Sequence, residues 1–304
     1  MSLRGKLEIV SQTDVGQVRD HNEDFLRFDD SAGVAVLADG MGGMNAGEVA
    51  SSMTVLLLMD LLVAFGQGDE TLVAELAEPD VTARNVKVPE MKAPRLPEEQ
   101  GPVHPRTALR PLPVRIVQHA IEKANQSVFH VSETQPQCQG MGTTVVVSLF
   151  YDNKMAVGHL GDSRVYRFRD QRLEQVTQDH SLVQELLDKG LVTPAEARVS
   201  SKKNVVTRAL GVARKVLVEV HEHETRPGDV YLLCSDGLTD LVTDEDIEVS
   251  LQELGGNLAL ATSHLINLAN ASGGKDNISV ILVRVRKPYP AQVSMLEKMV
   301  SWFE

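Results

Sequence analysis

The chain has 304 residues, of which 42% are hydrophobic and 24% are charged, an ordinary composition for a folded globular protein. Its formal net charge of -12 argues against binding to nucleic acid and against binding to an anionic membrane surface. The two cysteines, Cys138 and Cys234, share no metal-type spacing, and the first residues lack the apolar core of a signal peptide. We therefore expect a protein of a reducing compartment, the cytoplasm.

The N-terminal part is predicted to form strands followed by one long helix. Residues 7–13 and 25–38 have the apolar character of strands, and residues 45–65 favour a helix without any proline. Its most apolar stretch, 54–65, is shorter than the roughly 20 residues that span a bilayer, so we predict a buried helix. Residues 66–113 hold eight of the 13 prolines and are interpreted as a mobile insert, either a spacer or a docking segment.

The remaining chain is predicted to alternate runs of strands with helices. Helices are expected at 114–134, 179–189, 244–253 and 257–271. Strands are expected at 143–150, 155–160, 165–169, 216–222, 229–235 and 278–286. Ser181 is a candidate N-cap and Gly190 a candidate helix stop, and the tail 290–304 is predicted to hold one short amphipathic helix. Because the strands come in adjacent runs, we predict antiparallel sheets with segregated helices, an α+β fold.

Carboxylates stand at the ends of several predicted strands. Two apolar runs end in the same Asp-Gly turn, and further carboxylates follow or precede other strands or cluster near the N-terminus. The residues are Glu23, Asp24, Asp39, Asp162, Asp236 and Asp276. Burying a carboxylate costs several kcal/mol unless something compensates it, and few cations stand beside these positions. The pattern therefore predicts divalent metal ions and a hydrolytic site.

The expected metal is a hard cation with oxygen ligands. Mg²⁺ and Mn²⁺ prefer oxygen ligands in octahedral geometry. Two such ions about 3.5–4 Å apart generate a bridging hydroxide near neutral pH, and this nucleophile could attack phosphorus in line. No side-chain nucleophile is then required, which agrees with the lack of GxSxG, HExxH and Cys-His signatures in the sequence.

An ordered set of motifs resembles the PPM (PP2C-type) metal-dependent serine/threonine protein phosphatases, in their compact bacterial form. The matching stretches are Asp14–Asp24, Ala38–Gly43, Ala46–Glu48, Gly140–Thr144, Gly158–Arg164, Asp179–Ser181, Thr207–Gly211, Ser235–Leu238 and Asp276-Asn277. They occur in family order over about residues 8–286, apart from the insert.

The resemblance implies a four-layer α-β-β-α sandwich, with two central antiparallel sheets flanked by helix pairs. It implies one phosphatase domain at 1–288, with the insert at about 66–113 and a flap beside the active site at about 180–208. Residues 289–304 would then form a short amphipathic tail.

The resemblance also implies the metal ligands. Asp39 would bridge two Mn²⁺ or Mg²⁺ ions, and Asp236 and Asp276 would complete the site of the first ion. Glu23 and the carbonyl of Gly40 would serve the second ion, although Glu23 could also act only through water.

Three further residues receive roles from the same resemblance. Asp24 would act mainly through metal-bound water, because neighbours in an extended chain point to opposite faces and Glu23 takes the other face. Arg19 would hold the substrate phosphate with its planar fork, unless it is a plain ion-pair partner. Asp162, with Asp236, would hold a weaker third ion, unless it only caps a turn.

The chain departs from many family members after the first Asp-Gly, where it has Met41 in place of a histidine proposed as general acid. Methionine cannot donate a proton, so the leaving group must be protonated by metal-bound water or another group. The implied activity is hydrolysis of phosphoserine and phosphothreonine in protein substrates, by a monomer that reverses a cognate bacterial Ser/Thr kinase. Two alternatives stay open, a catalytically silent phosphoprotein-binding module and a signalling output switch with a partner surface on the insert or tail.

Overall fold

In the computed structural model, the described residues are 2–43, 46–68, 110–193, 196–197, 200, 202 and 204–291. Most of the predicted insert and of the predicted amphipathic tail, residues 69–109 and 292–304, lies outside them, so the proposed mobility of the insert and the tail helix stay predictions.

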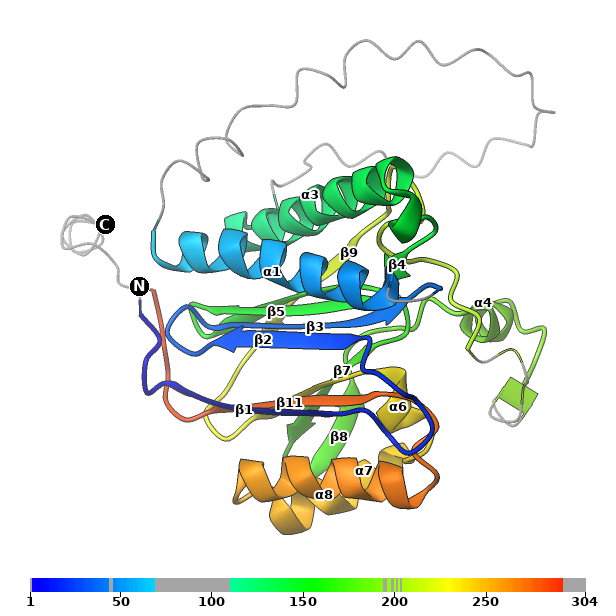
Figure 1. Ribbon diagram of the computed structural model, residues 1–304. Coiled ribbons are helices and arrows are strands. Elements are labelled where there is room, and N and C mark those ends of the chain that lie inside the picture. Colours follow the sequence, from blue (N-terminus) through cyan, green and yellow to red (C-terminus); the bar gives the residue numbers. More distant parts are fainter. Residues whose placement is uncertain are drawn as a thin grey trace, which may run out of the picture.

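Two antiparallel sheets form the centre of the molecule. Sheet I has the strand order β2 (Asp24–Asp29), β3 (Val34–Met41), β5 (Val145–Tyr151), β6 (Lys154–Leu160) and β9 (Glu219–Glu224), with β4 (Gly142–Thr143) paired to β3. Sheet II has the order β1 (Leu7–Asp14), β11 (Ile278–Val285), β10 (Val230–Cys234), β7 (Arg164–Arg169) and β8 (Arg172–Gln175). The two sheets lie face to face (Figure 1).

Helices cover the outer face of each sheet. Sheet I is covered by α1 (Ala46–Gly66) and α3 (Leu112–Thr134), and sheet II by α7 (Asp244–Leu254) and α8 (Leu258–Ala271), as Figure 1 shows. Three short elements complete the described fold, namely η2 (Pro136–Cys138), α4 (Leu182–Asp188) and α6 (Asp236–Thr239). The predicted α+β class and four-layer α-β-β-α sandwich are confirmed.

The central strands are buried on both faces, which explains their continuous apolar runs. In β3, Val36 packs in the core beneath α1 and α3, while its neighbour Leu37 packs in the core between the sheets. In β10, Leu233 faces that same inter-sheet core and Leu232 packs beneath α7 and α8. The side-chain alternation of strands therefore serves three cores at once.

Within the described residues, α1 is the single helix long and apolar enough to cross a membrane by length and composition. The sequence argument considered only its apolar half, whereas the whole helix has 21 residues. In the fold, Val55, Leu58 and Leu62 are fully buried and belong to the core that α1 shares with α3 and sheet I. This packing accounts for the apolar character of the helix.

The local predictions differ from the structure in a few places. The stretch predicted as one strand at 25–38 forms β2 and β3, because Asp29 accepts hydrogen bonds from the backbone of Ser31 and Ala32 and closes a tight turn. Strand β8 and helix α6 were not predicted, since both are only four residues long.

The local sequence explains where two of the helices begin. Helix α3 begins at Leu112, inside the predicted insert, because a proline is tolerated in the first helical turn, where its missing N–H has no partner to lose. Helix α4 begins after Ser181, whose hydroxyl accepts a hydrogen bond from the Gln184 N–H, so the predicted N-cap is confirmed.

Candidate metal centre

The predicted carboxylates meet at one end of the sandwich, where strand ends of both sheets come together. Asp39 in β3 lies directly opposite Asp24 in β2. From sheet II, Asp236 begins α6 just after β10, and Asp276 precedes β11. A side chain on Gly237 would overlap with the carbonyl of Asn277, so the Asp-Gly turn lets these two segments approach closely.

These residues line a cavity of about 560 Å³. Its walls include Arg19, Glu23, Asp39, Gly40, Asp162, Asp236 and Asp276. Seven of the eight predicted site residues therefore surround one space. The eighth, Asp24, is only 5% exposed and accepts a hydrogen bond from the Ser235 hydroxyl at 2.8 Å. We call Glu23, Asp24, Asp39, Asp162, Asp236 and Asp276 the acidic centre.

Burial and mutual repulsion disfavour ionisation of this centre. Burial, with the charges of Asp24 and Asp236 next in importance, raises the pKa of Asp39 well above its usual range. Burial and the charge of Asp162 do the same to the pKa of Asp236. Burial raises the pKa of Asp24 to about 6, and burial with the charge of Asp179 raises the pKa of Asp162 to about 6. An added cation would relieve both effects.

Three carboxylate oxygens of the centre are buried without a hydrogen-bond partner in the described structure. They are Oδ1 of Asp24, Oδ1 of Asp236 and Oε1 of Glu23, whose contact with Nε2 of His21 at 3.5 Å is an ion-pair distance without a hydrogen bond. A native structure satisfies nearly all buried polar atoms, so oxygens left without partners point to a ligand that accepts their lone pairs. The donor set contains only oxygens, which suits Mg²⁺ or Mn²⁺.

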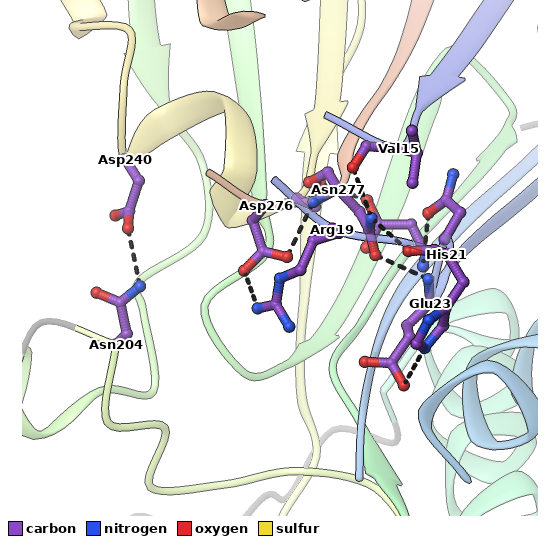
Figure 2. A network of polar contacts seen from close by, with 11 residues as sticks. Val15, Arg19, His21, Glu23, Asn204, Asp240, Asp276 and Asn277 are labelled. Carbon is purple, nitrogen blue, oxygen red and sulfur yellow. Dashed lines mark hydrogen bonds and ion pairs between the residues drawn. The ribbon is translucent and has the colours of Figure 1, made fainter. Parts of the chain in front are cut away.

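Arg19 is the single cationic side chain among the described residues that line the cavity. Its Nη2 donates to Oδ2 of Asp276 at 2.7 Å (Figure 2), and this hydrogen bond is the largest cause of the raised pKa of Arg19. The Arg19 side chain remains 50% exposed. The contact therefore aims the guanidinium at the cavity mouth without removing it from solvent.

Asn277 organises the loop that carries Arg19 and Glu23, a role that the sequence analysis did not assign. Its Oδ1 accepts the Glu23 N–H at 2.8 Å, and its Nδ2 donates to the carbonyls of Val15 and His21 at 3.0 Å each (Figure 2). The Asp276-Asn277 motif marked this position in the sequence. Its partners lie more than 250 residues away, so no local sequence pattern could reveal them.

Glycines let Glu23 and the Gly40 carbonyl approach the same place. A side chain on Gly40 would overlap with the Gly47 carbonyl in the first turn of α1. A side chain on Gly47 would lie 2.6 Å from Oε1 of Glu23. The Glu23 carboxylate therefore lies against the N-terminus of α1, whose dipole favours a negative charge.

Hydrogen bonds with neighbouring hydroxyls hold the backbone of Asp39 and the residue that follows Asp162. The Thr143 hydroxyl donates to the Asp39 carbonyl at 2.7 Å, and the Asp39 N–H donates to the Thr144 hydroxyl at 3.1 Å. That hydroxyl also lies 2.6 Å from the hydroxyl of Ser163, the residue after Asp162. Ser163 therefore has a structural role here.

A second cluster, His159, His180 and Glu219, has potential ligand atoms within 4.8 Å of one another. The Gly161 N–H donates to Nδ1 of His180, which places the imidazole proton on Nε2, facing Glu219 at 3.2 Å. Arg208 Nη1 also donates to Glu219, at 2.7 Å. Glu219 is already paired with Arg208, and Nε2 of His180 has no lone pair to give a metal ion. Within the described cluster this leaves Nδ1 of His159, which is buried without a hydrogen-bond partner, as the one available ligand atom, so the cluster is better described as a polar network than as a second metal centre.

Comparison with known proteins agrees with this geometry. The family model described as protein phosphatase 2C matches residues 16–267. The serine/threonine phosphatase Stp of Listeria monocytogenes is 34% identical over 275 residues, which cover 90% of this chain and 93% of that protein.

Solved structures show the same likeness. The Mycobacterium tuberculosis serine/threonine phosphatase PstP/Ppp matches with a TM-score of 0.72 and 33% identity, covering 92% of this chain and 99% of that one. A structure of the PstP catalytic domain in complex with two manganese ions matches with a TM-score of 0.70 and 33% identity, again over 92% and 99%. The chain therefore belongs to the protein phosphatase 2C family of serine/threonine protein phosphatases, hydrolases that act on phosphoproteins.

Proposed function

We propose that the protein hydrolyses phosphoserine and phosphothreonine in protein substrates with the help of two divalent metal ions, Mn²⁺ or Mg²⁺. The observation that carries this proposal is the set of three buried carboxylate oxygens without a hydrogen bond, two of them on residues that line the same cavity as Arg19. The two manganese ions in the related PstP structure support the choice of ion.

Each residue of the acidic centre has a role in this proposal. Asp39, which comes from sheet I and lines the cavity together with Asp236 and Asp276 from sheet II, would bridge both ions. Asp236 and Asp276 would complete one ion's site, and Glu23 with the Gly40 carbonyl would complete the other's. Asp24, turned toward Ser235, would act through coordinated water. Such ions, when bound, lower the pKa of a coordinated water and withdraw charge from phosphoryl oxygens.

The chain's own side chains bind and orient the phosphate. Arg19 offers N–H groups in a planar fork that suits two phosphoryl oxygens, and Asp276 holds that fork at the cavity mouth. Met41 lines the same cavity and offers no proton. The proton for the leaving serine or threonine must therefore come from a coordinated water or another group.

Two finer assignments belong to the same proposal. Asp162 and Asp236 both line the cavity and would hold a weaker third ion. The substrate class implies an opposing Ser/Thr kinase that supplies the phosphorylated proteins.

The test is hydrolysis of a phosphothreonine peptide by chelator-treated protein, with and without added Mn²⁺ or Mg²⁺. We expect negligible turnover after chelation and recovery upon addition of the ion. Full turnover in the metal-free state would contradict metal dependence. Metal binding without hydrolysis of any phosphopeptide would favour a phosphoprotein-binding module instead.

A further inference from the structure

The turn that contains Asp162 connects the two sheets. Strand β6 of sheet I ends at Leu160 and β7 of sheet II begins at Arg164, so three residues join one sheet to the other. We call residues 161–163 the Asp162 turn. Gly161 has a φ of +104°, in the region that favours glycine, and a side chain there would lie 2.7 Å from that of Thr144. The conformation of this turn decides where the Asp162 carboxylate enters the cavity of the acidic centre.

His180 holds the Asp162 turn through two hydrogen bonds. The Gly161 N–H donates to Nδ1 of the His180 ring at 3.2 Å, and the His180 N–H donates to the Gly161 carbonyl at 2.8 Å. Within the described residues, the His180 ring is the one acceptor of the Gly161 N–H. Because Gly161 is buried, loss of this acceptor would leave an unsatisfied backbone N–H in the interior.

Neighbouring side chains fix the orientation of the His180 ring. The ring stacks on that of His159 in β6, with centroids 4.5 Å apart and planes inclined by 14°. Nε2 of His159 donates in turn to the Gln178 carbonyl at 2.8 Å. Nε2 of His180 lies 3.2 Å from Oε1 of Glu219 in β9, a carboxylate that also accepts from Arg208. The stack sets the plane of the ring, and Glu219 favours the proton on Nε2.

The His180 ring has the protonation state that these contacts need. Burial, with the charges of His159 and Arg208 next in importance, lowers the pKa of His180 to about 4. The ring is therefore neutral at neutral pH and has one N–H and one lone pair. The N–H faces Glu219 and the lone pair faces the Asp162 turn.

The same residue closes the base of the segment predicted as a flap. The Thr207 N–H donates to the His180 carbonyl at 2.8 Å, and Ser181 pairs with Val206 in an isolated β-bridge. The two ends of the segment therefore meet at His180. Val206 also lines the cavity of the acidic centre. The base of the segment and the Asp162 turn thus share one residue that contacts both.

We propose that His180 is a positioning residue, whose ring and backbone hold the Asp162 turn and thereby set where the Asp162 carboxylate meets the weaker third ion. The inference rests on the proposed function, in which Asp162 and Asp236 hold that ion. A merely structural role, the filling of space beside β6, would depend on the size of the side chain. A positioning role depends on an acceptor at the place of Nδ1.

Two substitutions separate these roles, because each keeps the equivalent of one ring nitrogen. His180→Asn places its side-chain oxygen where Nδ1 stands and can accept the Gly161 N–H. His180→Gln is closer to histidine in size and places its amide where Nε2 stands, next to Glu219. With a phosphothreonine peptide and Mn²⁺, we expect kcat to fall about tenfold in His180→Gln, as when a partner of a metal ligand is removed. In His180→Asn it should stay within about twofold of wild type, whereas a role in packing predicts the reverse order.

A second measurement needs neither metal nor turnover. Hydrogen exchange of the Gly161 amide in the chelated protein should be at least about tenfold faster in His180→Gln than in the wild type and in His180→Asn. The matched control is His221→Gln, because His221 also approaches Glu219, at 4.0 Å, but its side chain is 59% exposed. This control should change neither kcat nor the exchange rate. Thermal unfolding checks that each variant is folded.

A double substitution tests whether His180 acts through Asp162. Asp162→Ala should itself lower kcat, and His180→Gln added to it should lower kcat no further, since residues that act as one unit are not additive. Independent roles would instead give losses that multiply.

The outcomes separate this inference from the function beneath it. Wild-type kcat in His180→Gln or in Asp162→Ala, a larger loss in His180→Asn than in His180→Gln, or losses that multiply would each overturn the positioning role and leave the phosphatase in place. If His180→Gln does not fold, a Gly161 amide that exchanges without protection in the wild type would overturn it as well. No hydrolysis of any phosphopeptide by the wild type with Mn²⁺ would contradict the proposed function itself.

Discussion

Buried carboxylates occur in two kinds of place in this molecule, and they differ in whether the chain supplies a cation. Asp229, only 2% exposed, receives two hydrogen bonds of 2.7 Å from Arg169. Asp179 is held in the same forked manner by Arg164. In the acidic centre, by contrast, Asp24, Asp39 and Asp236 have no arginine or lysine contact in the described structure.

The difference shows which carboxylates are built for the fold and which for a ligand. An ion pair satisfied within the chain needs nothing further, because the arginine offsets the charge of the carboxylate and donates hydrogen bonds to it. A group of carboxylates that burial and repulsion drive toward protonation is costly in the free protein. Such a cost is expected where an external cation completes the site. Substitutions at each kind of carboxylate, with activity and stability measured for both, therefore test this difference.

The largest expected effect is loss of turnover on removing charge from the acidic centre. Asp39→Asn and Asp236→Asn keep the side-chain volume but lose a ligand charge, and each should lower kcat by about 10²–10³-fold. Steady-state kinetics with Mn²⁺ measures this. Because each variant also relieves repulsion, its metal-free form should unfold at a temperature no lower than that of the wild type. A folded variant with wild-type kcat would remove that residue from the proposed centre.

The second prediction is that substitution of a paired carboxylate lowers stability and leaves activity unchanged. Asp229→Ala leaves Arg169 partly buried without its partner, which should lower the free energy of unfolding by about 3 kcal/mol. Chemical denaturation measures this, while kcat of the folded variant should stay within about twofold of wild type, on the order of the scatter between neutral substitutions. Glu174→Gln is the control, because its partner is Arg167 and its side chain is 64% exposed.

The third prediction concerns pH in the metal-free protein. Asp24 has a pKa of about 6 in the folded chain, above its value near 4 when unfolded, so the folded state binds the proton more tightly. Its contribution to stability is therefore greatest at low pH and is lost as pH rises through about 6. Relative to Asp24→Asn, the chelated wild type should lose about 2 kcal/mol between about pH 4.5 and 7.5.

Denaturation curves of both proteins at each pH provide the measurement. The comparison cancels the titrating groups that do not interact with Asp24, whereas the pKa of Asp39, which the charge of Asp24 raises, changes with the substitution. Mn²⁺ binds the ionised carboxylates, so it should stabilise the wild type more at the higher pH than at the lower one. A chelated wild type that gains stability relative to the variant as pH rises would show that Asp24 is compensated by the chain itself.

The acidic centre could be predicted from the sequence because the patterns that mark it are local. An apolar run followed by Asp-Gly, as at Asp39 and Asp236, marks a strand end with a carboxylate whatever the rest of the fold does. The pairing of Arg19 with Asp276 and the three bonds of Asn277 join positions more than 250 residues apart. Such contacts exist only after β1 and β11 have paired, so no local pattern encodes them.

The paired carboxylates escaped prediction for the same reason. Arg169 and Asp229 lie 60 residues apart and meet because β7 and β10 are neighbours in sheet II. The 450 Å³ cavity between α4 and the start of α7 likewise needs residues from two distant parts of the chain. The net negative charge of the chain follows from its composition, but only the fold shows which carboxylates are paired with cations.

The smallest expected effect concerns Arg19, the one cationic side chain among the described residues that line the cavity of the acidic centre, because its contact with a carboxylate is exposed whereas that of Arg169 is largely buried. Arg19→Lys keeps the charge but loses the planar fork, so kcat/KM for a phosphothreonine peptide should fall by about tenfold. The free energy of unfolding should change by less than about 0.5 kcal/mol, since the Arg19 side chain is 50% exposed and exposed pairs contribute little. Kinetics and chemical denaturation on the same preparation measure both quantities. A variant that loses stability but keeps its kcat/KM would make Arg19 a structural partner of Asp276, like Arg169 for Asp229, and would leave the substrate phosphate without its proposed side-chain ligand.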